Sequence, residues 1–203
     1  MNAVAHATKP SKEHSYSGEK NKVNKTEKSI DLKSKVRRIP EFKGVVFWDI
    51  TPLLKDKSCF RESIKQLAKH YRGKQIDAIV SNEARGFIIG AALAYELGVG
   101  FVPVRKKGKL PFKCVDLTYK KEYECDTVEI HQDAIEKGQN ILLIDDLLAT
   151  GGTVKANIEL VEKLGGNVVG LGFLIELGYL EGRKALGNKY DIYSIIQLKT
   201  SNG

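Results

Sequence analysis

The stretch ILLIDDLLATGGT, residues 141–153, decides the fold of this chain. Its first four residues, Ile141 to Ile144, form the short apolar run that is typical of a buried parallel strand. Two adjacent carboxylates follow, Asp145 and Asp146, and a turn of small residues then leads directly into a predicted helix. In an open α/β sheet, ligands bind outside the carboxyl ends of the strands. We therefore expect a binding site at residues 145–153.

The turn after the two acids has the chemistry of a phosphate cradle. Backbone N–H groups, two glycines and two hydroxyls gather at a helix N-terminus, which favours negative charge. The residues of this turn are Ala149, Thr150, Gly151, Gly152 and Thr153. The acids Asp145 and Asp146 repel phosphate but accept hydrogen bonds from the vicinal hydroxyls of a sugar. Neither G-x-x-x-x-G-K-[ST] nor G-x-G-x-x-G is present, so the pattern predicts a ribose beside a 5'-phosphate rather than a P-loop or a dinucleotide site.

The segments around this motif alternate between apolar runs and amphipathic stretches, which predicts an α/β fold with a parallel sheet and crossover helices. The predicted strands are 76–80, 99–104, 141–144, 168–175 and 190–198, and the predicted helices are 59–71, 85–97 and 153–164. Residues 105–126 fit neither period, are rich in charge and contain Gly108 and Pro111. Because long irregular connections are usually functional, we expect this stretch to be a lid loop.

Composition limits the organisation of the chain and its location. With 203 residues, of which 42% are hydrophobic, the chain fits one domain and a tail. Residues 1–29 are rich in Lys, Ser and Asn and predict a disordered tail, followed by a single domain over 30–203. There is no apolar run of membrane-spanning length and no secretory signal, so we expect a cytoplasmic protein without membrane attachment. Three cysteines without a C-x-x-C pair indicate a reducing compartment.

The formal net charge of +8 lies mostly outside the predicted tail. A diffuse basic excess suits an anionic small molecule as well as nucleic acid, and the charge alone does not choose between them.

The motif at 141–153 resembles the phosphoribosyl pyrophosphate (PRPP) motif of type I phosphoribosyltransferases. Further stretches narrow the resemblance to the adenine phosphoribosyltransferase family: IPEFKGVVFWDITPLL at 39–54, EARGF at 83–87, VPVRKKGKLP at 102–111, Glu122-Tyr123 and Glu129-Ile130. The resemblance implies a mostly parallel central sheet flanked by helices. It also implies a small hood over the base site, formed by about 36–54, and a mobile lid over about 105–126.

In this family, N9 of adenine displaces pyrophosphate from C1' of PRPP, giving AMP and pyrophosphate. The resemblance implies the same magnesium-dependent reaction, a homodimer and no nucleic-acid partner. We expect no protein metal site, because Mg²⁺ keeps much of its water and binds substrate phosphates. The ion is therefore expected to arrive with PRPP.

The resemblance also assigns roles to single residues. The 5'-phosphate is implied to bind Ala149, Thr150, Gly151, Gly152 and Thr153, and the ribose to bind Asp145 and Asp146. The pyrophosphate is implied to bind Arg85, Lys109 and Tyr123. The adenine is implied to bind Val46, Phe47, Trp48 and Leu147. The implied catalytic residues are Glu122, Lys109 and Arg85.

Two positions depart from the family's pattern: Trp48 stands where many relatives have arginine, and Glu124 stands where a glycine is usual. Three alternatives stay open at this point, the first because of these two departures and the third because of the basic charge. The chain could be a catalytically weak paralogue that binds PRPP or AMP, or an enzyme for another purine base. It could also be a PRPP-sensing nucleic-acid regulator, although the tail is too short and polar for a helix-turn-helix.

Overall fold

The structure is a computed structural model that describes residues 30–42, 44–120 and 125–202. The predicted tail, residues 1–29, lies outside this range. The strands are β1 (Arg37–Phe42), β2 (Val45–Asp49), β3 (Ala78–Asn82), β4 (Gly100–Lys106), β5 (Cys114–Lys120), β6 (Cys125–His131), β7 (Asn140–Leu148), β8 (Asn167–Leu177) and β9 (Ile192–Leu198). The helices are α1 (Thr51–Lys55), α2 (Lys57–Tyr71), α3 (Arg85–Leu97), α4 (Gly152–Lys163) and α5 (Gly182–Leu186), with short 3₁₀ turns at Lys33–Lys35 and Gly178–Leu180. Within the described part of the chain, no helix has the length and apolar character needed to cross a membrane.

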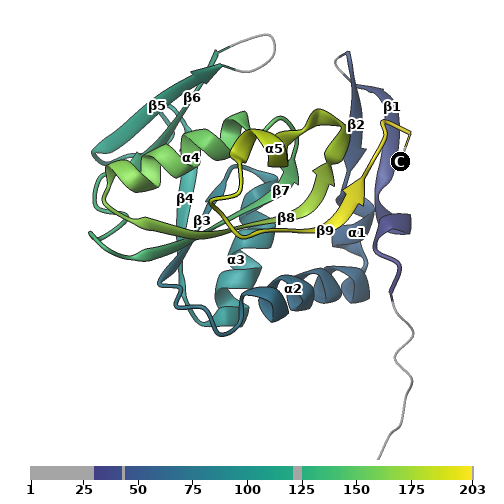
Figure 1. The fold of residues 1–203 in the computed structure, drawn as a ribbon, viewed down its shortest axis with the longest axis horizontal. Helices are drawn as coiled ribbons and strands as arrows, with labels where there is room; N and C mark the ends of the chain where they lie inside the picture. The colour runs from purple at the N-terminus through teal and green to yellow at the C-terminus, as the bar shows by residue number, and fades with distance from the viewer. Residues whose placement is uncertain (1–29, 43, 121–124, 203) are drawn as a thin grey trace, which may run out of the picture.

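A seven-stranded sheet forms the centre of the molecule, in the order β5-β6-β4-β3-β7-β8-β9 (Figure 1). Strands β4, β3, β7, β8 and β9 run parallel to one another, and β6 and β5 extend the sheet beyond β4 as an antiparallel hairpin. Strands β1 and β2 pair separately with each other. The predicted α/β class with a mostly parallel sheet is confirmed.

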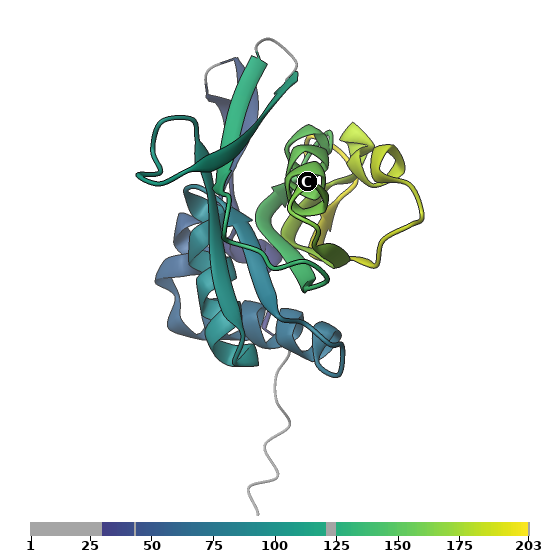
Figure 2. The ribbon, with the colours of Figure 1, turned by 90° about the vertical axis from the view of Figure 1, so that its left-hand side faces the viewer.

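Helices cover both faces of the sheet, with α2 and α3 on one side and α4 and α5 on the other (Figure 2). Alternate residues of a strand point to opposite faces. In β7, Leu142 and Ile144 therefore join the core beneath α2 and α3, whereas Ile141 and Leu143 join the core beneath α4. Because β7 is buried on both faces, its sequence from Ile141 to Ile144 is a continuous run of apolar residues.

The stretch 105–126 differs from the irregular loop that the sequence predicted. It contains the end of β4, a turn, all of β5 and the start of β6. Leu117 pairs with Val128 across the hairpin, and both side chains are buried. In β5, Val115, Leu117 and Tyr119 alternate with Asp116 and Thr118, which is the period of a strand, so the predicted irregular conformation is wrong. Its role as a lid stays a prediction.

Tyr71 at the end of α2 joins the helix layer to the sheet. The side chain is fully buried, and its hydroxyl donates to the carbonyl oxygen of Leu171 in β8 at 2.8 Å. Burial is the main cause that raises the pKa of this phenol, so the group stays a donor. The bond satisfies a polar group that would otherwise lie unpaired in the core.

We expect Tyr71→Phe to lower the free energy of unfolding by about 1 kcal/mol, the usual net value of such a bond. Urea unfolding of both proteins gives this difference. The matched control is Tyr95→Phe, because Tyr95 is 90% exposed and its hydroxyl lies at the surface. Equal midpoints for Tyr71→Phe and the parent would contradict the assigned bond.

Candidate active site

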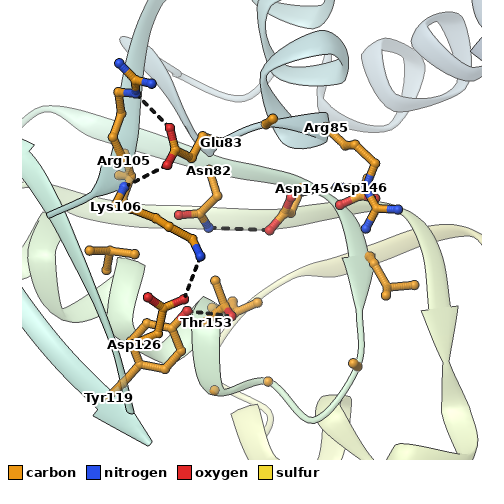
Figure 3. Close-up of a pocket in the computed structure, with 18 of the residues that line it drawn as sticks. Asn82, Glu83, Arg85, Arg105, Lys106, Tyr119, Asp126, Asp145, Asp146 and Thr153 are labelled. Atoms are coloured by element: carbon orange, nitrogen blue, oxygen red, sulfur yellow. Dashed lines mark hydrogen bonds and ion pairs between the residues drawn. The ribbon is translucent and has the colours of Figure 1, made fainter. Parts of the chain in front are cut away.

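A polar cavity of about 410 Å³ opens at the carboxyl ends of the parallel strands. Its walls come from the ends of β3, β4 and β7, from the turn before α4 and from the β5–β6 hairpin (Figure 3). The parallel register places Ser81 of β3 beside Ile144 of β7, so Asn82 at the end of β3 lies level with Asp145 of β7. The cavity therefore lies where the sequence predicted a site.

The turn at residues 149–153 lines one side of this cavity. Gly151 has φ +88°, a left-handed conformation that favours glycine, and it precedes the first turn of α4. The first N–H groups of α4 have no partner within the helix, and they lie at its positive end. A phosphate placed here would meet backbone donors and the hydroxyls of Thr150 and Thr153.

The turn is backed from behind by α5. A Cβ on Gly182 would lie only 2.1 Å from the carbonyl oxygen of Ala149, and a Cβ on Gly151 would lie 3.2 Å from the carbonyl oxygen of Gly182. Only glycine at position 182 allows α5 to approach the turn so closely. The position of the turn thus depends on this backbone contact.

The two carboxylates at the end of β7 lie in the cavity but have different partners. Asp146 is 7% exposed and forms an ion pair with Arg85, whose Nε lies 2.8 Å from Oδ2. Asp145 accepts from the backbone N–H of Asp146 at 2.9 Å and from the amide of Asn82 at 3.4 Å. No Lys or Arg in the described ranges forms an ion pair with Asp145.

Desolvation raises the pKa of both carboxyls. For Asp145 the neighbouring charge of Asp146 adds to this effect and takes its pKa well above the usual value. For Asp146 the positive charge of Arg85 opposes it. Asp145 is therefore the acid whose charge is least compensated, and it faces the cavity.

Glu83 gathers positive groups at the opposite wall. Its Oε2 lies 2.8 Å from Nε of Arg105, and its Oε1 lies 3.4 Å from Nζ of Lys109 and accepts from the N–H of Lys106. Burial favours the neutral acid, but these hydrogen bonds outweigh it and lower the pKa of Glu83. The carboxylate holds the cations beside the cavity and partly offsets their charge.

A second cavity of about 440 Å³ lies next to the first and is mainly apolar. Val46, Phe47 and Trp48 of β2 form one wall, together with Leu147 of β7 and Tyr179. The indole of Trp48 is buried, and its N–H lies 3.4 Å from the hydroxyl of Tyr179. A flat, uncharged ring system fits such a slot.

Leu147 and Ala149 line both cavities, so the two spaces meet at the end of β7. Arg85 also connects them, because its guanidinium lies 4.8 Å from the centre of the Phe47 ring while its Nε contacts Asp146. A molecule with a phosphate, a sugar and a flat base could extend from the turn at 149–153 through this junction into the apolar slot.

The structure brings together most of the residues that the sequence selected. The polar cavity holds the two acids, Arg85 and the turn, and the apolar cavity holds the four residues selected for the base. Lys109 does not line either cavity, and its side chain is 52% exposed. Glu122 and Tyr123 lie outside the described residues. In the described ranges, no group of three or more His, Cys, Asp or Glu side chains is arranged to hold a metal ion.

Several cavity residues were not selected from the sequence. They are Asn82, Glu83, Arg105, Lys106, Tyr119 and Asp126. Ligands bind at the carboxyl ends of parallel strands, and this rule could have identified Asn82, Glu83, Arg105 and Lys106. These four residues follow the apolar runs of β3 and β4. The hairpin residues gave no such signal.

The polar cavity with its helix-start turn, joined to an apolar slot, is typical of the class of protein that binds a phosphorylated sugar, and the comparisons agree with this class. Residues 51–200 match the family model described as phosphoribosyl transferase domain. A relative named adenine phosphoribosyltransferase from Thermotoga sp. (strain RQ2) is 56% identical over 169 residues, covering 82% of this chain and 99% of the relative. The chain belongs to the adenine phosphoribosyltransferase family.

Solved structures agree with this assignment. The adenine phosphoribosyltransferase of Thermoanaerobacter pseudethanolicus is 53% identical, with a TM-score of 0.80 over 82% of this chain and 98% of that one. The enzyme of Saccharomyces cerevisiae, solved with an imino-altritol bisphosphate and adenine, is 40% identical. Its TM-score is 0.74 over 80% of this chain and 95% of that one.

We expect Gly182→Ala to displace the turn at 149–153, because the added methyl would overlap a backbone carbonyl. The affinity for AMP, measured by calorimetry, should fall by about tenfold or more, as expected from misplaced phosphate donors. Gly100→Ala is the matched control, since its Cβ would meet only ordinary contacts at 3.6 Å and beyond. Unchanged affinity in Gly182→Ala would show that α5 does not fix the turn.

We expect Asp145→Asn to stabilise the ligand-free protein at neutral pH. The folded protein holds the Asp145 proton more tightly than the unfolded chain, so ionisation costs stability as the pH rises from about 3.8 through the raised pKa. Above that window, removing the charge should raise the thermal midpoint by roughly 2 to 4 °C, the shift from about 1 kcal/mol. Near pH 3 the two midpoints should converge. Thermal unfolding across this pH range tests the sign, and a lower midpoint at pH 7 would contradict it.

Proposed function

We propose that the chain transfers the 5-phosphoribosyl group from PRPP to N9 of adenine, giving AMP and pyrophosphate. The junction of a polar and an apolar cavity at Leu147 and Ala149 carries this proposal. The reacting atoms, C1' of the sugar and N9 of the base, would meet at this junction. Family membership supplies the reaction, and purine salvage is the process it serves.

The sugar phosphate is proposed to bind along the end of β7. The turn at 149–153 holds the 5'-phosphate with helix N–H groups and hydroxyls. Asp145 and Asp146 accept hydrogen bonds from the ribose hydroxyls. Arg85 can keep its Nε on Asp146 and present its two remaining nitrogens to the pyrophosphate, for which a planar guanidinium is well suited.

The donor set also fits a magnesium ion that arrives with PRPP. Asp145 is a carboxylate without a cation partner in the described ranges, and it would face the ion through retained water. When bound, Mg²⁺ neutralises charge on the departing pyrophosphate. The protein's own residues orient the sugar and keep the apolar slot free of water.

The adenine is proposed to lie between Phe47 and Leu147, with Val46 offering backbone groups and Trp48 closing the floor. The indole at position 48, where many relatives have arginine, is buried in the core and also lines the apolar cavity. Residues 36–54 would act as the hood and 105–126 as the lid. Glu122, for proton transfer on the purine, and Tyr123, for the pyrophosphate, complete the proposed site.

The remaining assignments follow the family. We propose a homodimer in the cytoplasm that has no nucleic-acid partner.

The direct test is incubation of the purified chain with PRPP, Mg²⁺ and adenine, with AMP measured by chromatography. Parallel reactions with hypoxanthine and guanine test the base. AMP as the only nucleotide product across these reactions supports the proposal. Binding of AMP without turnover would instead indicate a catalytically weak paralogue. Product formed from hypoxanthine or guanine would indicate a different base specificity.

We expect Lys109→Ala to lower kcat by on the order of 10², if its ammonium reaches the pyrophosphate chiefly in the transition state. In the structure this group is held by Glu83, so it must move to act. Lys113→Ala is the control, because this exposed lysine lies in the same connection. Equal kcat values for both variants would leave Lys109 as a surface residue.

A further inference from the structure

Tyr119 lines the polar cavity and has been given no role so far. It lies in β5, and its half-buried ring packs against the core on the α4 side of the sheet. Its hydroxyl oxygen lies 3.1 Å from Oγ1 of Thr153, the contact drawn in Figure 3. The hairpin and the turn before α4 thus meet through two hydroxyl groups inside the cavity.

The chemistry of the site fixes the direction of this hydrogen bond when a phosphate is bound. Each hydroxyl carries one proton and can also accept, whereas an ionised phosphate oxygen only accepts. If Thr153 binds a phosphate, its proton must point at the phosphate, and its oxygen is left to accept from Tyr119. The resulting series runs from the phenol to Thr153 and on to the phosphate. Hydrogen bonds in such a series strengthen each other.

We propose that Tyr119 is a positioning residue for the 5'-phosphate that acts through Thr153. This inference rests on the proposed function, which places the 5'-phosphate in the turn at 149–153. The phenol donates to Thr153 and so directs the threonine proton into the cavity. Packing of the ring against the core holds the phenol in place before the substrate arrives, and less rotational freedom is lost on binding.

Tyr119→Phe removes only the hydroxyl and keeps the ring. We expect the Kd for AMP, measured by calorimetry, to rise about threefold to tenfold, the range for loss of one hydrogen bond. The KM for PRPP should rise in parallel, while kcat at saturating PRPP stays within about twofold, because the contact is present before and during transfer. Tyr95→Phe is the control, since that side chain is 90% exposed on α3.

A double-mutant cycle tests whether Tyr119 acts through Thr153. In a Thr153→Val background, Tyr119→Phe should cause no further loss of AMP affinity. In a Thr153→Ser background, which keeps a hydroxyl, the loss should return. Additive losses in the valine background, or an unchanged affinity in Tyr119→Phe itself, would overturn the proposal. Thermal unfolding of each variant establishes that it is folded.

The two proposals can fail separately. If the parent chain neither forms AMP nor binds it, the proposed function fails. If the parent forms and binds AMP while Tyr119→Phe matches it in both KM and Kd, only the role of Tyr119 fails.

Discussion

Burial of two adjacent carboxylates at the end of a central strand is the constraint on which the rest of the site depends. Asp145 and Asp146 follow four apolar residues of β7, and desolvation raises the pKa of both. Arg85 compensates one of them. The other, Asp145, stays uncompensated at the site proposed above for the sugar, and this cost to stability would be a typical exchange for function.

Close backbone approach allows this short segment to be enclosed from two sides. A Cβ on Gly86, at the start of α3, would lie 2.6 Å from Oδ1 of Asp145, and a Cβ on Gly182 of α5 would lie still closer to the turn, 2.1 Å from the carbonyl oxygen of Ala149. Side chains at either position would widen the site. The proposed binding residues are therefore held in place by two glycines, which have no side chain.

The sequence predicted most of what is local and little of what depends on sheet order. Residues 141–153 carry strand, acids, turn and helix start in one continuous pattern, so their site could be predicted without knowing the neighbours. Asn82 and Arg105 join it only because β3 lies between β4 and β7. The hairpin was missed although Val115, Leu117 and Tyr119 alternate with polar residues in β5, because so short an alternation inside a long charged connection is a weak signal until its pairing with β6 is known.

The assignments to Glu122 and Tyr123 rest on resemblance alone, since those residues lie outside the described ranges. By contrast, the apolar cavity combines residues selected from the sequence with a contact between distant positions. The residues of β2 were selected from the sequence, but the partnership of Trp48 with Tyr179 joins positions 131 residues apart in the chain. Trp48 is also the sole tryptophan of the chain. Emission excited selectively at tryptophan therefore originates at the wall of the apolar cavity, and the chain carries its own optical reporter of what enters there.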